Sequence, residues 1–217
     1  FDHSSFDRLL HANVSAGKVN YSAFKNNPTF AAYLGALETA NLSGASNDEK
    51  LAFWINAYNA SVIKNVNDHP GTRKPTDVKG FFDAIKFKVA GKRLTLNDIE
   101  NTEIRAHFKE PLIHFGLVCA AVNCPPLIDH AYSSTNVRTQ LAANARAYLA
   151  SRYNRYDAAK KTLSLSKIFD WYGDDFGGAE GRLRFVASYG TPAMKQAITA
   201  GNVKVAFLEY DWTLNGR

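Results

Sequence analysis

The sequence predicts an α+β fold, a mostly helical single domain with a small antiparallel sheet built from hairpins. Three observations support this class. Several segments repeat apolar residues every three or four positions, which is the spacing of one helix face. Two short stretches alternate apolar and polar residues around a turn, as a β-hairpin does. The chain has 217 residues and a hydrophobic content of 46%, which is enough for one full-sized core.

No segment of the chain has the composition of a linker between domains. We therefore expect one domain over residues 1–217, in which the helices of residues 1–45 pack on a core formed by residues 46–217. Residues 4–14 are predicted to form a short amphipathic helix. A second helix is predicted from about Pro28 to Glu38, because proline is favoured in the first turn of a helix.

The clearest predicted element is a third helix, which begins at Ser46. Ser46 and Glu49 fit a capping box, and the helical pattern continues to about Asp68, where the sequence His69-Pro70 ends it. This helix contains the phrase FWINAYNA (53–60). The phrase is apolar on several sides, which predicts a buried helix.

Two amides in that helix need an explanation. Asn56 and Asn59 lie about one turn apart, and buried amides without hydrogen-bond partners are costly. The interpretation that we favour is that they hold neighbouring loops through backbone hydrogen bonds. The alternative is a functional role, in which one of them orients a catalytic group or donates to a substrate carbonyl.

The rest of the chain predicts shorter elements. Alternation around Ala90 and Gly91 indicates a hairpin within residues 81–96, and Thr95 with Asp98 is expected to cap the helix that follows. The apolar run 112–122 has no polar period, and we favour a helix there. The later predicted elements are a helix at 134–152, a hairpin turning near 157–160, a short aromatic helix at 167–177, helices at about 179–189 and 191–200, and a strand at 202–210.

Charge and cysteine content exclude several classes of partner. The net charge is +6, but the 26 Lys and Arg residues are spread along the chain, so we do not expect nucleic acid as a partner. No apolar stretch reaches the ~20 residues of a transmembrane helix. Cys119 and Cys124 are the only cysteines, so a structural zinc site is not expected. No cofactor is expected either. In an oxidising compartment the two can form a local disulfide.

Five phrases resemble one known family. They are FWINAYNA (53–60), LTLNDIEN (94–101), HFGLVCAAVNCPPL (114–127), LSLSKIFDWYGDDF (163–176) and LEYDWTLN (208–215). Together they are similar to the family known only as domain of unknown function 547. The resemblance implies a secreted or periplasmic bacterial protein, which fits a chain that begins at Phe1 as if a signal peptide had been removed.

The candidate catalytic residues lie within these phrases. Cys119 can act as a nucleophile if a base or a helix N-terminus stabilises its thiolate, and otherwise it is a small buried apolar residue. His114 is five residues away, about 140° around a helix, so a direct dyad with Cys119 is not expected. Glu100 is expected to pair with Lys167 or Arg105, or to orient a histidine of the site.

One predicted helix face offers a metal site as an alternative. Glu100, Glu103 and His107 are spaced to share one face of a helix, and such a face can bind a divalent cation. We favour a solvated surface instead, because Glu103 and His107 lie outside the family phrases. No metal is therefore expected.

The candidate binding residues are Asn56, Asn59, Trp54, Lys167 and Tyr172. A cleft lined by Trp54, Lys167 and Tyr172 would suit a small molecule, a peptide or a glycan. That cleft is the functional alternative. The default interpretation is packing against the FWINAYNA helix, with Lys167 in an ion pair.

Three functions remain open from the sequence. The first is a cysteine-dependent hydrolase or acyl transferase of the cell envelope that uses Cys119. The second is a non-catalytic ligand- or partner-binding module with structural cysteines. The third is a thiol-disulfide redox protein, although the spacing of Cys119 and Cys124 differs from the redox CxxC pattern.

Overall fold

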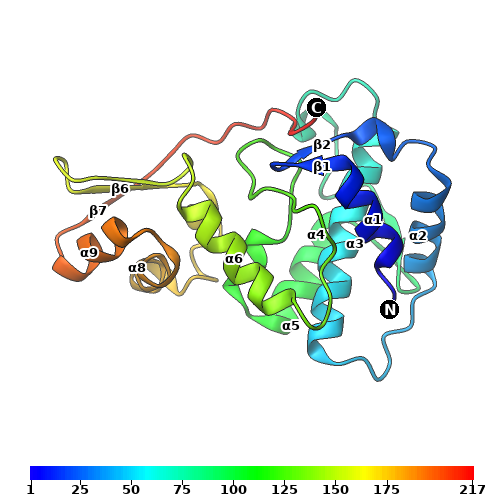
Figure 1. Ribbon diagram of the computed structural model, residues 1–217, viewed down its shortest axis with the longest axis horizontal. Coiled ribbons are helices and arrows are strands. Elements are labelled where there is room, and N and C mark those ends of the chain that lie inside the picture. Colours follow the sequence, from blue (N-terminus) through cyan, green and yellow to red (C-terminus); the bar gives the residue numbers. More distant parts are fainter.

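The structure is a computed structural model that describes all residues, 1–217, and it has the predicted α+β class in a single domain. Helix α3 (Asn47–Asp68) runs through the middle, with α1 (Ser4–Asn13) and α2 (Pro28–Glu38) on one side and α6 (Val137–Leu149) on the other (Figure 1). Beyond α6 lie α8 (Gly178–Tyr189) and α9 (Pro192–Ala200). One cluster of buried apolar side chains connects these helices.

Helix α3 has the predicted capping box and the predicted burial. The Ser46 side chain accepts from the Glu49 amide, and the Glu49 carboxylate accepts from the Ser46 amide at 2.7 Å. Every residue of FWINAYNA is buried, so this part of the helix is surrounded by protein on all sides. The helices of the chain include none with the length and apolar character needed to cross a bilayer.

The strands are short and pair mainly as hairpins. They form the antiparallel pairs β1 (Val14–Ser15) with β2 (Lys18–Val19), β3 (Phe87–Val89) with β4 (Lys92–Leu94), and β5 (Arg155–Asp157) with β6 (Thr162–Leu165). Strand β7 (Lys204–Phe207) joins the last pair and lies parallel to β6. The predicted hairpins and the predicted last strand are confirmed, and the parallel pairing of that strand with β6 is an addition, made possible because α7 (Ile168–Trp171), α8 and α9 form the crossover.

The helix after β4 contains a widened turn. It begins with the predicted Thr95 cap as α4 (Leu96–Asp98), becomes a π-helix over η3 (Ile99–Arg105) and ends as α5 (Ala106–Phe108). A π-helical turn is uncommon and is frequently found at functional sites. It also changes which side chains share a face, because the spacing per turn is no longer 3.6 residues.

The prediction of a helix at residues 112–122 is wrong. Only η4 (Pro111–Phe115) is helical, as a 3-10 helix, and the chain then continues without regular structure. The physical reason lies in Asn59, which accepts from the Val118 amide at 3.0 Å and donates to the Gly116 carbonyl at 2.8 Å. These side-chain bonds replace the bonds that a helix would have made.

The remaining short 3-10 helices, η1 (Tyr21–Ala23) and η2 (Pro75–Asp77), lie in connections. After β7 the chain runs back across the molecule to end near β1 and β2 (Figure 1). There the Asn215 carbonyl accepts from the Val19 amide at 3.1 Å, and the Arg217 amide donates to the Val19 carbonyl. Segments from both ends of the sequence are thus joined in one hydrogen-bond network.

Candidate active site

A cavity of about 370 Å³ lies where six parts of the chain meet: α3, the loop before β3, the helix formed by α4 and η3, η4 with the segment after it, α7 with Tyr172, and the C-terminal segment. It gathers residues from the five phrases that the sequence analysis singled out. Its polar lining is Tyr58, Asn97, Glu100, His114, Cys119, Cys124, Tyr172 and Tyr210. Its apolar lining is Phe82, Leu117, Ile168, Trp171 and Trp212.

Both cysteines are free thiols, and they lie in contact. The Cys119 amide donates to Sγ of Cys124 at 2.8 Å, and Sγ of Cys119 lies 3.3 Å from the hydroxyl of Tyr210. Burial by itself raises the pKa of the Cys119 thiol, but hydrogen bonds from Cys124, Tyr210 and the Ala121 backbone together lower this pKa below its ordinary value. Burial raises the pKa of Cys124 well above its ordinary value, so Cys119 is the thiol that ionises first.

The backbone at Cys119 is unusual. Ala120 has φ +66, in the left-handed region that residues with a side chain rarely adopt. The strained turn is fixed by the C-terminal segment, since the Asn215 amide donates to the Ala120 carbonyl at 2.9 Å and the Val122 amide donates to the Thr213 carbonyl at 2.8 Å. Strained backbone of this kind persists only where its surroundings hold it, and it is common at active sites.

His114 is held in a fixed orientation by Asp175. Nε2 of His114 lies 2.8 Å from Oδ2 of Asp175, and the imidazole stacks on the Tyr172 ring with centroids 3.9 Å apart. A carboxylate only accepts, so Nε2 carries a proton. Nδ1 has no hydrogen-bond partner in the protein, and His114 lines the cavity. When the ring carries only this proton, Nδ1 can accept a proton or a hydrogen bond from a bound molecule.

Asp175 also holds Arg105. The guanidinium donates twice to the carboxylate, from Nε at 2.7 Å and from Nη2 at 2.9 Å, and it lies over the Tyr172 ring at 5.2 Å. Hydrogen bonds from His114 and then Arg105 hold the pKa of Asp175 far below its ordinary value. The carboxylate is thus ionised at neutral pH and stabilises positive charge on His114.

Several predicted contacts of the site residues are wrong. Glu100 pairs with neither Lys167 nor Arg105, and it does not orient His114, because Asp175 takes that role. Lys167 pairs instead with Asp170 at 2.9 Å and lies outside the cavity lining. Sequence spacing alone does not show which of two carboxylates, Glu100 or Asp175, pairs with Arg105 and His114, because tertiary packing decides which one lies near them.

Trp54 does not share a cleft with Tyr172. It lines a second cavity, of about 550 Å³, together with the Lys92–Glu103 ion pair. Glu103 is 7% exposed, so the solvated surface expected for Glu103 is also wrong. The widened π-helical turn sends Glu100 and Glu103 to different cavities, and no group of three or more His, Cys, Asp or Glu side chains is arranged to hold a metal ion.

The two amides of α3 have the structural role that we favoured. Asn56 donates to the Tyr132 carbonyl at 2.8 Å and accepts from the Tyr132 amide at 3.0 Å. Asn59 makes the same pair of bonds with Gly116 and Val118, directly before Cys119. Neither lines the cavity. Asn59 therefore positions the segment that carries the thiol and does not contact a substrate.

Sequence reasoning missed Tyr58 and Tyr210. Tyr58 belongs to the FWINAYNA helix, for which the sequence predicts burial alone, but its hydroxyl has no hydrogen-bond partner in the protein and it lines the cavity. The sequence signal that could have identified Tyr58 is a tyrosine in a buried helix, because its hydroxyl needs a hydrogen-bond partner, which a ligand can supply. Tyr210 lies 91 positions from Cys119, and no local pattern connects the two.

Comparison with known proteins gives one family. The model of the family described as "Protein of unknown function, DUF547" matches residues 42–149. No curated protein and no solved structure matches the chain. The matched range contains α3, Glu100, His114 and the two cysteines, whereas Tyr172, Asp175 and Tyr210 lie beyond it.

Proposed function

The chain belongs to the DUF547 family, and from the cavity that its residues form we propose that it is a cysteine-dependent enzyme that hydrolyses or transfers an acyl group. The observation that carries the proposal is the environment of Cys119. Its thiol opens into a cavity, has a lowered pKa and accompanies a histidine that a carboxylate holds in place. A nucleophile, a base and an orienting carboxylate are the recurring elements of such enzymes.

The proposed reaction begins with attack of the Cys119 thiolate on the carbonyl carbon of the substrate. The thiol proton passes to water in the cavity, and Nδ1 of His114 takes it up. The C–S bond forms, the bond to the leaving group breaks, and His114 returns the proton to the departing amine or alcohol. Water, or a second acceptor, then attacks the thioester and releases Cys119. Asp175 stabilises the imidazolium in between.

Cys119 and His114 are not hydrogen-bonded to each other, and Tyr210 is the side chain that contacts the thiol besides Cys124. In the proposal, the two residues therefore act from different sides of the substrate. The free hydroxyl of Tyr58 is available to donate to the substrate oxygen on which negative charge develops. The family resemblance adds the proposal that the enzyme acts in the cell envelope.

The test is alkylation by iodoacetamide with peptide mapping by mass spectrometry. We expect Cys119 to be modified before Cys124, with a rate that rises with pH around a midpoint below the ordinary thiol pKa. Tyr210→Phe removes a bond to the thiolate and should move this midpoint upward. Tyr189→Phe, a change on α8 away from the cavity, is the matched control.

Two results would contradict the proposal. One is a Cys119 that stays unmodified in the folded protein across the pH range. The other is a wild-type protein isolated with a Cys119–Cys124 disulfide that re-forms after reduction, which would support the redox function instead.

A further inference from the structure

Glu100 is a buried carboxylate without a cationic partner. Its exposed fraction is 7%, it lines the cavity beside Cys119, and it forms no ion pair. The basic residues of the same helix are already engaged, since Arg105 pairs with Asp175. Burial and then repulsion from this carboxylate raise the pKa of the Tyr172 phenol, and the carboxylate adds to the effect of Asp175 in raising the pKa of the Arg105 guanidinium, but no Lys, Arg or His nitrogen lies within ion-pair distance of it. A buried carboxylate in that state is costly unless a positive group approaches it.

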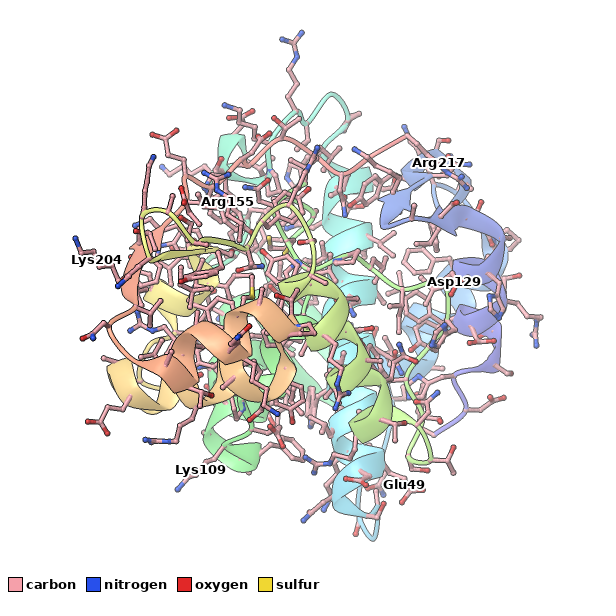
Figure 2. The ribbon with its side chains drawn as sticks, turned by 60° about the vertical axis from the view of Figure 1, so that its left-hand side comes forward. Glu49, Lys109, Asp129, Arg155, Lys204 and Arg217 are labelled. Carbon is pink, nitrogen blue, oxygen red and sulfur yellow. The ribbon has the colours of Figure 1, made fainter.

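The charge of the cavity is opposite to that of the protein. The chain has a net charge of +6, yet no Lys or Arg lines the cavity, which holds Glu100 and the Cys119 thiol. The basic side chains of Lys109, Lys204 and Arg217 lie at separate edges of the molecule (Figure 2). An anionic ligand would therefore meet the Glu100 carboxylate and the Cys119 thiol inside the cavity, with no Lys or Arg side chain to pair with it.

Aromatic rings form much of the remaining cavity wall. Phe82, Trp171 and Trp212 line it together with Tyr58 and Tyr172. Trp171 and Trp212 stack with centroids 5.7 Å apart, and Trp171 is 48% exposed at the rim. Aromatic faces attract cations, most strongly where water is excluded, and a carboxylate beside them adds a full negative charge.

We propose that the acyl substrate bears an ammonium group, primary or alkylated, which binds between Glu100 and the aromatic wall while its carbonyl lies at Cys119. This inference rests on the proposed function for the position of the carbonyl. The ammonium site itself depends only on Glu100 and the rings. Binding compensates the buried charge of Glu100, and neutral compounds of the same shape gain no such interaction.

Binding is tested on the Cys119→Ala variant, so that no reaction interferes. Two of the three tryptophans line the cavity, and their fluorescence reports occupancy. Choline is compared with 3,3-dimethylbutan-1-ol, which has the same shape without the charge. We expect choline to bind at least about tenfold more tightly, as a desolvated cation–π and carboxylate site should give. Equal binding of the two compounds would overturn the inference.

The side chain responsible is tested with Glu100→Gln, which keeps the shape and removes the charge. It should abolish the preference for choline. Glu103→Gln is the matched control, because Glu103 is equally buried on the same helix but lines the other cavity. A preference that survives Glu100→Gln, or that is lost equally with Glu103→Gln, would contradict the assignment. Thermal unfolding of each variant shows whether it is folded.

A reactivity experiment separates this inference from the proposed function. The wild-type protein is treated with methanethiosulfonates that carry either a trimethylammonium or a sulfonate group, and modification of Cys119 is followed. We expect the cationic reagent to react faster, and Glu100→Gln to reduce that difference. If Cys119 is inert but choline still binds preferentially, the proposed function fails and the ammonium site stands. If Cys119 reacts equally fast with both reagents, the proposed function stands and the ammonium site fails.

Discussion

At the scale of single residues, the site depends on polar side chains that each serve more than one partner. Asp175 accepts from both His114 and Arg105, with the same oxygen shared between Nε2 of His114 and Nε of Arg105. Tyr172 contacts both groups, since its ring stacks on the imidazole and the guanidinium lies 5.2 Å from its centroid. A change at Asp175 therefore affects the orientation of the histidine and the position of the arginine together.

Asp175→Asn should lower the free energy of unfolding at neutral pH by about 1–3 kcal/mol, because charge-assisted hydrogen bonds are lost. The pKa of Asp175 is depressed in the folded state, so its contribution is complete above the pKa of a free carboxyl, about 4. The contribution is lost as the pH falls below that value. Urea unfolding of wild type and variant from pH 7 to pH 3 measures this difference.

The difference between the two proteins should be constant near neutrality and shrink in acid. A difference that grows as the pH falls would contradict the assigned ion pairs. Asp174→Asn is the control, since Asp174 is exposed and forms no ion pair. It should change stability by less than about 0.5 kcal/mol at every pH.

At the scale of elements, helix α3 acts as the support for two loops. Asn56 and Asn59 each bind one backbone N–H and one backbone C=O in segments that have no regular structure of their own. The side chains of α3 thus supply the loops with backbone hydrogen bonds that regular secondary structure would otherwise have supplied. The burial of the helix keeps water from competing for these bonds.

Asn59→Ala and Asn56→Ala should each reduce the free energy of unfolding by about 2–4 kcal/mol, because each leaves two buried backbone groups unpaired. Only Asn59→Ala should also change the alkylation rate of Cys119, since Asn59 binds the segment directly before the thiol. Chemical unfolding and iodoacetamide labelling measure the two effects. Equal effects of both variants on labelling would show that Asn59 has no specific role in positioning Cys119.

Local patterns predicted the elements that are stabilised by nearby residues. The caps at Ser46 and Thr95 and the turn at Ala90 and Gly91 were each visible within a few positions. The irregular segment after η4 was not predicted, because its hydrogen-bond partner, Asn59, is 57 positions away from Gly116. In the site, Cys119 and His114 were found from family phrases, but Tyr210 and the role of Asp175 depend on packing between distant segments.

At the scale of the whole molecule, the C-terminal segment connects the site to the N-terminal hairpin. Its backbone binds the loop at Ala120, and the Asn215 side chain accepts from the Tyr21 hydroxyl at 2.6 Å. Tyr210 and Trp212 of the same segment form part of the cavity lining. The position of the cavity wall is therefore coupled to the contact between Asn215 and Tyr21, which are 194 positions apart in the sequence.

Asn215→Ala should lower the free energy of unfolding by about 1–3 kcal/mol, since it leaves the buried Tyr21 hydroxyl without its acceptor. Tyr21→Phe in the Asn215→Ala background should cost little more, because the hydroxyl has already lost its partner. A double-mutant cycle by urea unfolding measures this coupling. Additive effects of the two changes would show that the bond contributes nothing to stability.

The contact between Cys119 and Tyr210 also has a consequence for biosynthesis. The two residues are separated by 91 positions, so a ribosome that adds about 5–20 residues per second needs roughly 5–18 s to reach Tyr210 after Cys119. Throughout that interval the nascent chain has the cysteine but not the hydroxyl that stabilises its thiolate. The arrangement that lowers the pKa of Cys119 is completed only after this late segment has emerged and folded back, so the site forms at the end of synthesis.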